Sequence, residues 1–445
     1  MAPKAQNIPL QSTLGMKYPT YRDLRLKNTD IWLEGKRIDD GAEGLWRIHD
    51  DLYDLNDFID KHPGGAFWLK MTKGTDITEA FEVHHISDSP EKLLPKYWKR
   101  KAKTSRNSPF SFKDDGFYRT LKRKVRPLLK DLPKRDSRWS NFYSDIMAFG
   151  LFLFGVLATR YIDFYFATIC GILMALVTIA GHNYMHRKDN WRMYYPDLSL
   201  LQSREFRMFH IFSHHLYTNT IADLEISLHE PIMEFLPKRK SFVHRYLSII
   251  YAPFYWLTLN HIGVIKRILI FLVLKRTSHF GFHDLVSFFP LLVMYVLGEQ
   301  PFWIAFKMWF TATLVASLYF NLIGFTAAHH HPKIFHDGDK PRPEIPFDWG
   351  LGQLDAVMDR FEIDGSHFLI LTNFGNHALH HFFPTLDHGQ LKYLEPVFQE
   401  TLKEFNIKLR KTTIPTLMLG MFKQITNADP NSDPPELYLK SQKRN

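Results

Sequence analysis

The chain has 445 residues, which suits two or three domains, and its single cysteine, Cys170, excludes a disulfide framework and a cysteine-based metal site. Hydrophobic residues make up 45% and charged residues 23%, so bulk composition by itself does not reveal a membrane part. The net charge of +10 fits loops that face anionic lipid, and no helix-turn-helix, zinc-finger or RNA-binding signature supports nucleic acid as a partner.

The beginning of the chain divides into a lead-in and a compact domain. Residues 1–27 are polar and turn-rich, and we expect them to form an extended N-terminal segment. They lack the apolar core and the cleavage site of a signal peptide, so we expect the N-terminus to stay in the cytosol. Residues 28–100 mix short strand-like and helix-like pieces, which predicts one α+β domain.

A haem-binding motif lies inside this domain. His62-Pro63-Gly64-Gly65 follows the strand-like Tyr53-Asp54-Leu55, and His84 and His85 come 22 and 23 residues after His62. Two neutral imidazoles can hold haem iron from opposite faces, and a haem with both axial sites filled only shuttles electrons. These motifs resemble the cytochrome b5 haem-binding domain. The resemblance implies haem b with His62 and His85 as ligands, and His84 is the alternative to His85.

Charge is distributed unevenly around this domain. Six acidic residues border the haem motif and form either a solvated surface or a docking patch for a basic electron donor: Asp51, Asp54, Asp57, Asp60, Glu79 and Glu82. Residues 101–140 form a basic linker, and its position before an apolar stretch favours a juxtamembrane role.

Four apolar stretches follow in two pairs. Residues 142–159 and 162–180 are separated by a short turn, and so are residues 283–297 and 302–325. Each pair predicts a helical hairpin, because about 20 apolar residues are needed to cross a bilayer as a helix. The third stretch is short and the fourth contains Lys307, so these two fit the requirement less well.

Two membrane hairpins and a cytosolic N-terminus predict a topology. Segments 1–140, 181–282 and 326–445 would all face the cytosol, and the short outer loops would carry one basic residue, Arg160, as the positive-inside rule requires. Residues 241–274 are apolar but punctuated by charged side chains, which favours amphipathic helices that lie in the membrane interface.

Three histidine clusters and one triplet lie outside the apolar stretches. Histidines three or four residues apart share one face of a helix, so each cluster presents two or three imidazoles to one point. Imidazole suits iron, zinc and copper, and eight or nine imidazoles are too many for one ion but fit two. The clusters are His182 and His186; His210, His214 and His215; His377, His380 and His381; and the triplet His329-His330-His331.

These clusters resemble the histidine boxes of the membrane fatty acid desaturase family across residues 140–400. In acyl-CoA desaturases a further ligand follows a pair of small residues, which implies His329 after Ala327-Ala328, with His330 as the alternative. By resemblance the remaining ligands of a di-iron centre are His182, His186, His210, His214, His215, His377, His380 and His381.

The chain also departs from the family pattern. His377 stands where front-end desaturases, the members with N-terminal haem fusions, have Gln, and Phe325 stands where Asn is typical. Three residues rather than two separate His210 from His214. The arrangement is most similar to insect proteins that fuse a haem domain to a desaturase-like domain, on the stretches 32–37, 73–78 and 383–388.

The expected architecture is therefore an α+β cytochrome b5-like domain followed by a mainly α-helical membrane domain at residues 141–425. The membrane domain would have four transmembrane helices and a cytosolic histidine-box cap, and a polar tail would follow at residues 426–445. The resemblance implies a fatty acyl or sphingolipid desaturase of the endoplasmic reticulum membrane, which uses O2 and electrons passed from haem to two iron ions. Its implied partners are a flavoprotein NADH-cytochrome b5 reductase, the lipid bilayer and an acyl lipid substrate.

Two alternatives stay open at this point. A lipid hydroxylase of the same family would use the same centre, and a non-enzymatic membrane-anchored haem electron carrier would use the histidine clusters only structurally. Asp223 and Asp387 lie near the second and third clusters, where a carboxylate can fix the tautomer of a ligand imidazole, although a capping or solvated role suits them equally.

Overall fold

The structure is a computed structural model that describes residues 11–276, 281–344 and 346–435. The first ten residues of the predicted N-terminal segment and the last ten of the predicted tail lie outside the described residues. The predicted domain boundaries stay predictions, and the elements are given below as the structure has them.

The N-terminal part has the predicted α+β character. Helix α1 (Thr29–Asp39) begins where the Asn28 side chain accepts a hydrogen bond from the Ile31 N–H, which caps its first turn. An antiparallel sheet in the order β1-β2-β3 pairs Trp46 with Tyr53. Its strands and the remaining elements are β1 (Trp46–Ile48), β2 (Asp51–Tyr53), η1 (Asn56–Lys61), α2 (Ala66–Thr72), α3 (Thr78–His84), α4 (Ser89–Leu93), η2 (Leu94–Tyr97) and β3 (Trp98–Lys101).

The predicted basic linker is folded onto its neighbours. It contains β4 (Phe110–Ser111), α5 (Phe117–Val125) and η3 (Arg126–Lys130). Arg119 and Lys122 form ion pairs with Glu82 of the N-terminal domain, and Lys122 is almost fully buried. Glu79 and Glu82 are also fully buried, so neither belongs to an exposed acidic docking patch.

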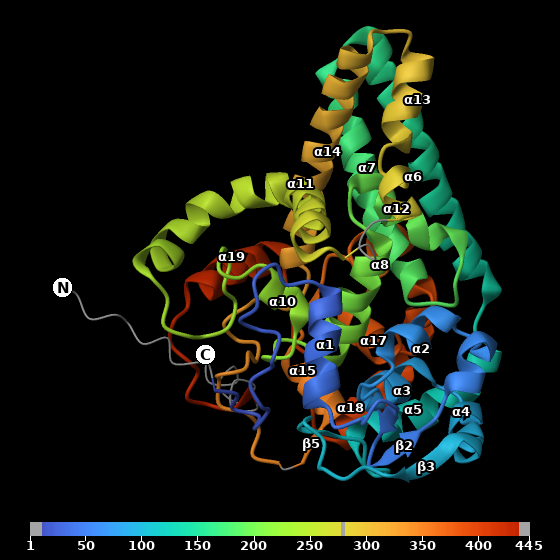
Figure 1. Cartoon of the computed structure of the whole chain (residues 1–445), viewed down its shortest axis with the longest axis vertical. Coiled ribbons are helices and arrows are strands. Elements are labelled where there is room, and N and C mark those ends of the chain that lie inside the picture. The colour runs from blue at the N-terminus through green and yellow to red at the C-terminus, as the bar shows by residue number, and fades with distance from the viewer. Residues whose placement is uncertain (1–10, 277–280, 345, 436–445) are drawn as a thin grey trace.

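Both predicted hairpins are present, in a bundle at one end of the molecule (Figure 1). The first consists of α6 (Lys134–Tyr161) and α7 (Phe164–Met185), and the second of α13 (Phe289–Gly298) and α14 (Phe302–Phe325). Asp163 lies between the two helices of the first hairpin and caps the start of α7, where its side chain accepts a hydrogen bond from the Tyr165 N–H at 2.6 Å. The structure therefore has the predicted fold class, a mixed domain followed by a mostly helical one with apolar candidate spans.

The third apolar stretch is helical over nearly its predicted bounds and is short, as its sequence indicated. The stretch breaks into α12 (Phe282–Val286) and α13, because Pro290 favours the first turn of a new helix. The ten residues of α13 rise only ~15 Å, about half of the hydrocarbon thickness. This stretch is therefore not among the four described helices that are long and apolar enough to cross a membrane.

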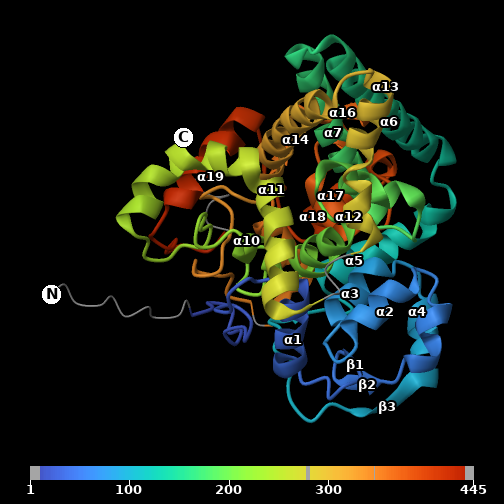
Figure 2. The ribbon, with the colours of Figure 1, turned by 45° about the horizontal axis from the view of Figure 1, so that its top comes forward.

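The fourth such helix covers Val243–Leu274, where we expected several amphipathic helices. A π-helical turn, η6 (Val243–Leu247), continues directly into α11 (Ser248–Leu274). The helix lies across the base of the bundle in both views rather than along it (Figures 1 and 2). Only 17% of its most apolar window is buried in protein, so its position in the membrane interface stays a prediction that this direction supports.

The rest of the chain forms a cap between the bundle and the N-terminal domain (Figure 1). Two short parallel sheets, β4-β5 and β6-β7, tie distant segments of the chain together. The cap elements are η4 (Trp191–Ser199), α8 (Ser203–Phe206), η5 (Arg207–His214), α9 (His215–Tyr217), α10 (Leu224–Leu228), β5 (Phe347–Asp348), α15 (Trp349–Asp355), β6 (Asp359–Arg360), α16 (His367–Thr372), α17 (His377–Phe382), η8 (His388–Tyr393), α18 (Glu395–Glu404), β7 (Lys411–Thr412) and α19 (Ile414–Thr426).

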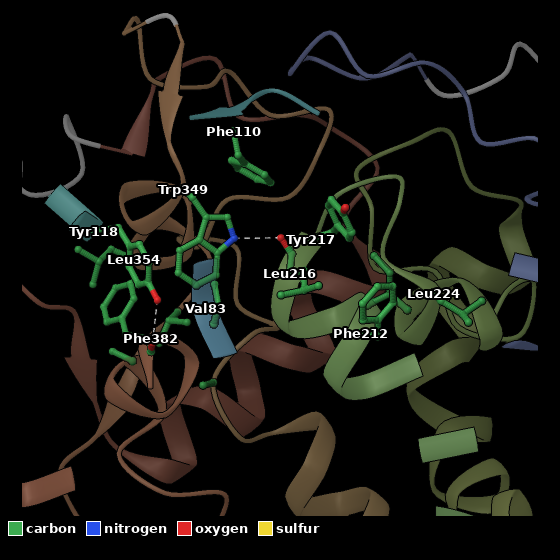
Figure 3. Packing of buried hydrophobic residues seen from close by; sticks show 14 of the residues in the cluster. Val83, Phe110, Tyr118, Phe212, Leu216, Tyr217, Leu224, Trp349, Leu354 and Phe382 are labelled. Carbon is green, nitrogen blue, oxygen red and sulfur yellow. Dashed lines mark hydrogen bonds between the residues drawn. The ribbon is translucent and has the colours of Figure 1, made fainter. Parts of the chain in front are cut away.

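One hydrophobic core joins the N-terminal domain to the cap (Figure 3). Val83 of the N-terminal domain lies in the same cluster as Phe212 of the second histidine cluster and Phe382 of the third. Trp349 lies at its centre and donates a hydrogen bond from its indole N–H to the Leu216 carbonyl at 3.1 Å. Burial of this much aromatic surface across the junction holds the two parts in one arrangement.

Candidate metal centre and haem site

The haem motif places two imidazoles opposite one another. His62 lies at the end of η1 and His85 just after α3, and their ring centroids are 6.0 Å apart. The Nδ1 atom of each ring donates a hydrogen bond at 2.9 Å to a backbone carbonyl, that of Gly65 or of Phe81, which leaves Nε2 free to bind a metal. Since a metal–imidazole bond measures ~2 Å, one iron ion fits between these rings.

The structure distinguishes the two candidates for the second haem ligand. His85 faces His62, whereas the ring of His84 lies 6.3 Å from that of Trp68. The Nε2 atom of His84 is shielded from solvent and has no hydrogen-bond partner among the described residues. The geometry therefore favours His85, the residue that the sequence resemblance also implied.

Five of the nine predicted metal ligands meet in one group. Their ring nitrogens all lie within 4.8 Å of one another, and all five side chains are buried. His182 is at the centre, with its Nε2 atom 2.9 Å from that of His186, 2.9 Å from that of His210 and 3.2 Å from that of His380. The members are His182, His186, His210, His215 and His380.

A second group lies beside the first. It consists of His214, His329 and His381, again with every ring nitrogen within 4.8 Å of the others. His377 adjoins it, because its Nε2 atom is 2.6 Å from that of His329. The rings of His215 and His381 stack at 4.0 Å, so the two groups share a boundary. All nine predicted ligands are thereby brought together.

The unusual spacing of the second cluster is resolved by its backbone. Residues Arg207–His214 form a π-helix, η5, in which the His215 N–H donates to the carbonyl of His210, five residues earlier. In this wider turn His210 and His215 point into the first group, whereas His214 points into the second. A π-helical turn is often found at functional sites. Here it allows side chains of one helix to reach both histidine groups.

His330, the alternative to His329, faces elsewhere. Its ring stacks on Phe235 with centroids 3.7 Å apart and is not part of either group. His329 is held in the second group because its Nδ1 atom donates to the Ala356 carbonyl at 2.8 Å.

Outer partners orient most of the rings. The predicted contact of Asp223 is present, since its carboxylate accepts from His214 Nδ1 at 2.9 Å. Glu225 accepts from His210 Nδ1 at 2.6 Å, and the Gln353 side-chain oxygen accepts from His381 Nδ1 at 2.9 Å. Such partners fix the tautomer in which Nε2 carries a lone pair. The sequence analysis missed Glu225 and Gln353, although an acid two residues after Asp223 was a usable signal.

Asp387 takes the capping role that the sequence left open, and among the described residues its carboxylate contacts no ring of either group. It accepts hydrogen bonds from Ser140, Asn183 and Arg187, and it caps η8. The neighbouring His388 makes the contact instead, with its Nε2 atom 3.1 Å from His380 Nδ1. The sequence analysis missed this role, since nothing in the spacing of His388 marks it as a partner of His380.

The nine rings fit a metal site on electrostatic grounds. Burial lowers the pKa of most of them well below its ordinary value, which favours the neutral form that binds metals: His186, His215, His329, His377, His380 and His381. Their Nε2 lone pairs converge at ~3 Å, the spacing expected for ligands around one ion with bonds of ~2 Å. Neutral lone pairs packed in this way repel one another unless a cation lies between them.

His214 behaves differently from the other rings. Burial lowers its pKa, but the charges of Glu225 and Asp223 and the hydrogen bond to Asp223 outweigh burial and raise the pKa to about 9. Two carboxylates therefore favour positive charge at this position, whether it is carried by a proton or by a metal ion.

A cavity of about 210 Å³ reaches the histidine groups. It lies between α11, α14 and the second cluster, and its wall includes His210, His214, His329 and His377. Most of the remaining wall is apolar, with aromatic side chains such as Phe206, Phe209, Phe320 and Phe325. Lys27 and Lys266 also line it. An apolar cavity with a few polar groups suits a lipid-like ligand.

Comparisons with known proteins agree with both halves of this description. The family described as "Fatty acid desaturase" matches residues 162–413, and the family described as "Cytochrome b5-like Heme/Steroid binding domain" matches residues 34–103. No solved structure matches the chain significantly.

Curated relatives cover nearly the whole chain. It is 42% identical to the "Cytochrome b5-related protein" of Drosophila melanogaster, over 96% of this chain and 98% of the relative, which confirms the resemblance to insect fusion proteins. Identity is 24% to the "Probable Delta(5) fatty acid desaturase C" of Dictyostelium discoideum, over 84% of this chain and 90% of the relative. Identity is 22% to the "Acyl-lipid (8-3)-desaturase" of Mortierella alpina, over 81% of this chain and 88% of the relative.

Proposed function

Because this chain belongs to the fatty acid desaturase family and carries a cytochrome b5-like domain, we propose that it is a membrane-bound lipid desaturase dependent on O2, haem and two iron ions. One observation carries the proposal. Two adjacent groups of buried imidazoles, with their Nε2 atoms converging, form part of the wall of an apolar cavity.

In this proposal the first ion is held by the group around His182 and the second by His214, His329, His377 and His381. The haem is held by His62 and His85. A bound iron pair would supply the oxidising power of O2 for removing hydrogen from an unactivated CH2 group. The aromatic wall of the cavity would orient a fatty acyl or sphingolipid chain along the histidines and exclude water.

We propose that a flavoprotein NADH-cytochrome b5 reductase supplies the electrons and that the protein resides in the endoplasmic reticulum membrane. Both termini and the histidine centre would face the cytosol. The arrangement in Figure 1 supports this orientation, because the described ends of the chain lie beside the cap, away from the loops at the far end of the hairpins. Arg160 in the last turn of α6 and Glu299 directly after α13 lie at that far end and pair with one another at 3.1 Å.

Reconstitution tests the proposal. The purified chain with haem, iron, NADH, reductase and an acyl-CoA or sphingolipid is expected to produce a new double bond, detected by mass spectrometry. The variant His380→Ala is expected to lose product and iron while its haem spectrum stays unchanged. His244→Ala serves as the matched control, since this histidine lies on η6 outside both histidine groups. A hydroxylated product would assign the hydroxylase activity instead, and unchanged product in His380→Ala would refute the proposed centre.

The same preparation separates the enzyme from a simple electron carrier. About two iron ions per chain besides haem iron, with O2 uptake that depends on lipid, support the enzyme. A chain that holds haem, no other iron and shows no O2 uptake would be an electron carrier.

A further inference from the structure

The haem domain is packed rigidly onto the histidine centre. Trp32 of α1 packs edge-on against Phe212 of η5 at 5.9 Å, and its indole N–H donates to the Ala222 carbonyl. Tyr217, close after the second cluster, donates to the buried carboxylate of Glu79 at 3.1 Å. Trp32, Phe212 and Tyr217 all belong to the continuous hydrophobic core, and Figure 3 shows the last two of them. A domain held by a buried core does not move freely on its linker.

The tight turn of the haem motif lies against the first histidine cluster. Gly65 has a positive φ of +105°, and an added Cβ atom would come within 2.6 Å of the Asp189 carboxylate. Asp189 follows His186 by three residues and accepts a hydrogen bond at 2.8 Å from the buried guanidinium of Arg207. The loop that carries His62 is thus in contact with the segment that follows the first histidine cluster, and the helix of the second cluster is bonded to that same segment.

Helix α2, which follows the haem motif, contacts the π-helix of the second histidine cluster through stacked side chains. The Arg207 guanidinium stacks on the rings of Trp68 and Phe67, at 4.4 and 4.7 Å. Trp68 packs against the core clusters of both domains, and on its other side it lies 6.3 Å from His84. Arg207 begins the π-helix of the second cluster, and His84 directly precedes His85.

His84 is held in place beside Trp68. Its Nδ1 atom donates to the Ala80 carbonyl at 3.0 Å, which fixes the ring, and its shielded Nε2 atom has no partner among the described residues. The rings of His84 and Trp68, tilted by 34° to one another, and the Arg207 guanidinium form a row of delocalised π groups. This row leads from the residue before His85 to the first residue of the π-helix that carries the second histidine cluster.

We propose that Trp68 and His84, with Arg207 stacked beside them, bridge the haem and the metal pair, so that the haem domain acts as a fixed electron donor. This inference rests on the proposed function. Each event passes one electron from ferrous haem, which becomes ferric, through these side chains to the metal pair. The reductase of the proposed function then reduces the haem again.

Stopped-flow absorption measures this transfer directly. The full chain, loaded with haem and iron in lipid nanodiscs, is reduced without oxygen and mixed with O2 and an acyl-CoA, and reoxidation of the haem is followed by its visible bands. Trp68→Leu is expected to slow the fast phase about tenfold or more, while the haem spectrum, haem midpoint potential and iron content stay unchanged. His84→Gln, which keeps a polar side chain of similar size, is expected to slow it as well.

Trp98→Leu is the matched control, because Trp98 is an exposed tryptophan on β3 of the same domain and donates to Asp51. Its fast phase is expected to match that of the parent chain within about twofold. Reoxidation at the parent rate in both Trp68→Leu and His84→Gln would overturn the bridge. His380→Ala tests the premise separately: if it keeps the fast phase, electrons do not reach the histidine centre and the proposed function itself fails.

Discussion

At the scale of single residues, the direction of the imidazoles depends on carboxylates that accept hydrogen bonds from them. Glu225 holds His210 at 2.6 Å and also acts on His214. Replacing Glu225 by Gln removes its negative charge, so we expect iron affinity to fall roughly 10–100-fold, as is typical for outer partners of metal ligands. Iron retained after dialysis against a graded chelator measures this.

Glu400→Gln is the control for that change, because Glu400 is exposed and its ion pair is with Lys124, away from both histidine groups. Equal iron retention in the two variants would show that Glu225 does not support the centre.

Residue types, spacing and family resemblance were sufficient to predict which histidines converge, but of the partners that orient them they predicted Asp223 alone. His182 and His186 are four residues apart on α7, and this periodicity could be recognised from the sequence. Gln353 and His388 could not be recognised in the same way, because Gln353 meets His381 only when α15 packs against α17. Partners that depend on tertiary packing carry no local pattern.

At the scale of elements, close approach of helices in the bundle depends on small residues. A Cβ atom on Gly171 of α7 would lie 2.5 Å from the Ala312 carbonyl oxygen of α14. We therefore expect Gly171→Ala to destabilise the bundle by about 1–3 kcal/mol, because backbone atoms cannot move aside. Thermal unfolding in detergent measures the change.

Gly263→Ala on α11 is the counterpart, because its nearest atom would be 3.7 Å away. Alanine is there expected to add stability of up to about 1 kcal/mol through helix propensity. A lower Tm for Gly263→Ala would contradict the packing argument, and so would an unchanged Tm for Gly171→Ala.

The position of α11 in the membrane can be measured by site-directed spin labelling. Ile250, which is 64% exposed, is expected to lie about 5–10 Å below the headgroups if α11 lies in the interface. A nitroxide at Ile250→Cys should then be shallower than one at Leu153→Cys on α6, which is expected near the bilayer centre. Cys170 is buried and does not compete for the label. Equal depths would show that α11 spans the membrane.

The sequence predicted the hairpins better than it predicted α11. Continuous apolar runs gave the helices α6, α7 and α14 with their turns. In residues 241–274 the charged side chains suggested amphipathic helices, yet Val243–Leu274 is one continuous helix. Its Arg267 pairs at 3.1 Å with Asp284 of α12, a different segment. Ion-pair partners from another segment can neutralise such charges, and the composition of a helix does not show which partners it will meet.

At the scale of the whole molecule, attachment of the haem domain should depend on pH. Burial raises the pKa of Glu82, but hydrogen bonds from His49 and Arg119 and the charge of Lys122 outweigh burial and hold the pKa at about 2. Its ordinary value is 4.5, so the carboxylate stabilises the folded chain above about pH 4.5. This contribution, on the order of 3 kcal/mol, is lost as the pH falls from 4.5 toward 2.

Glu82→Gln tests this dependence. The variant is expected to be less stable than the parent at pH 7, and the difference should shrink as the pH falls from 4.5 toward 2. Urea unfolding in detergent, followed by loss of the haem spectrum, measures both chains. A difference that does not change with pH would show that the charge of Glu82 is not what stabilises the junction.

Two domains and a basic linker could be predicted from the sequence, but their docking could not. The linker cations were expected at a lipid surface, whereas Lys122 lies 40 residues after its partner Glu82 and is buried with it. The hydrogen bond from Tyr217 to Glu79 spans 138 residues of chain. Pairings at such distances follow from the assembled fold and leave no periodic trace.

The wide turn of η5 has a consequence for interpreting related sequences. Adding one residue to an ordinary α-helix rotates everything beyond it by about 100° and would turn a downstream histidine away from its metal. In this chain the extra residue is absorbed locally, since His215 still bonds back to His210. The number of residues between two histidines is therefore not a safe test of whether such a motif still binds metal. A relative with one residue more or fewer can keep the same ring directions.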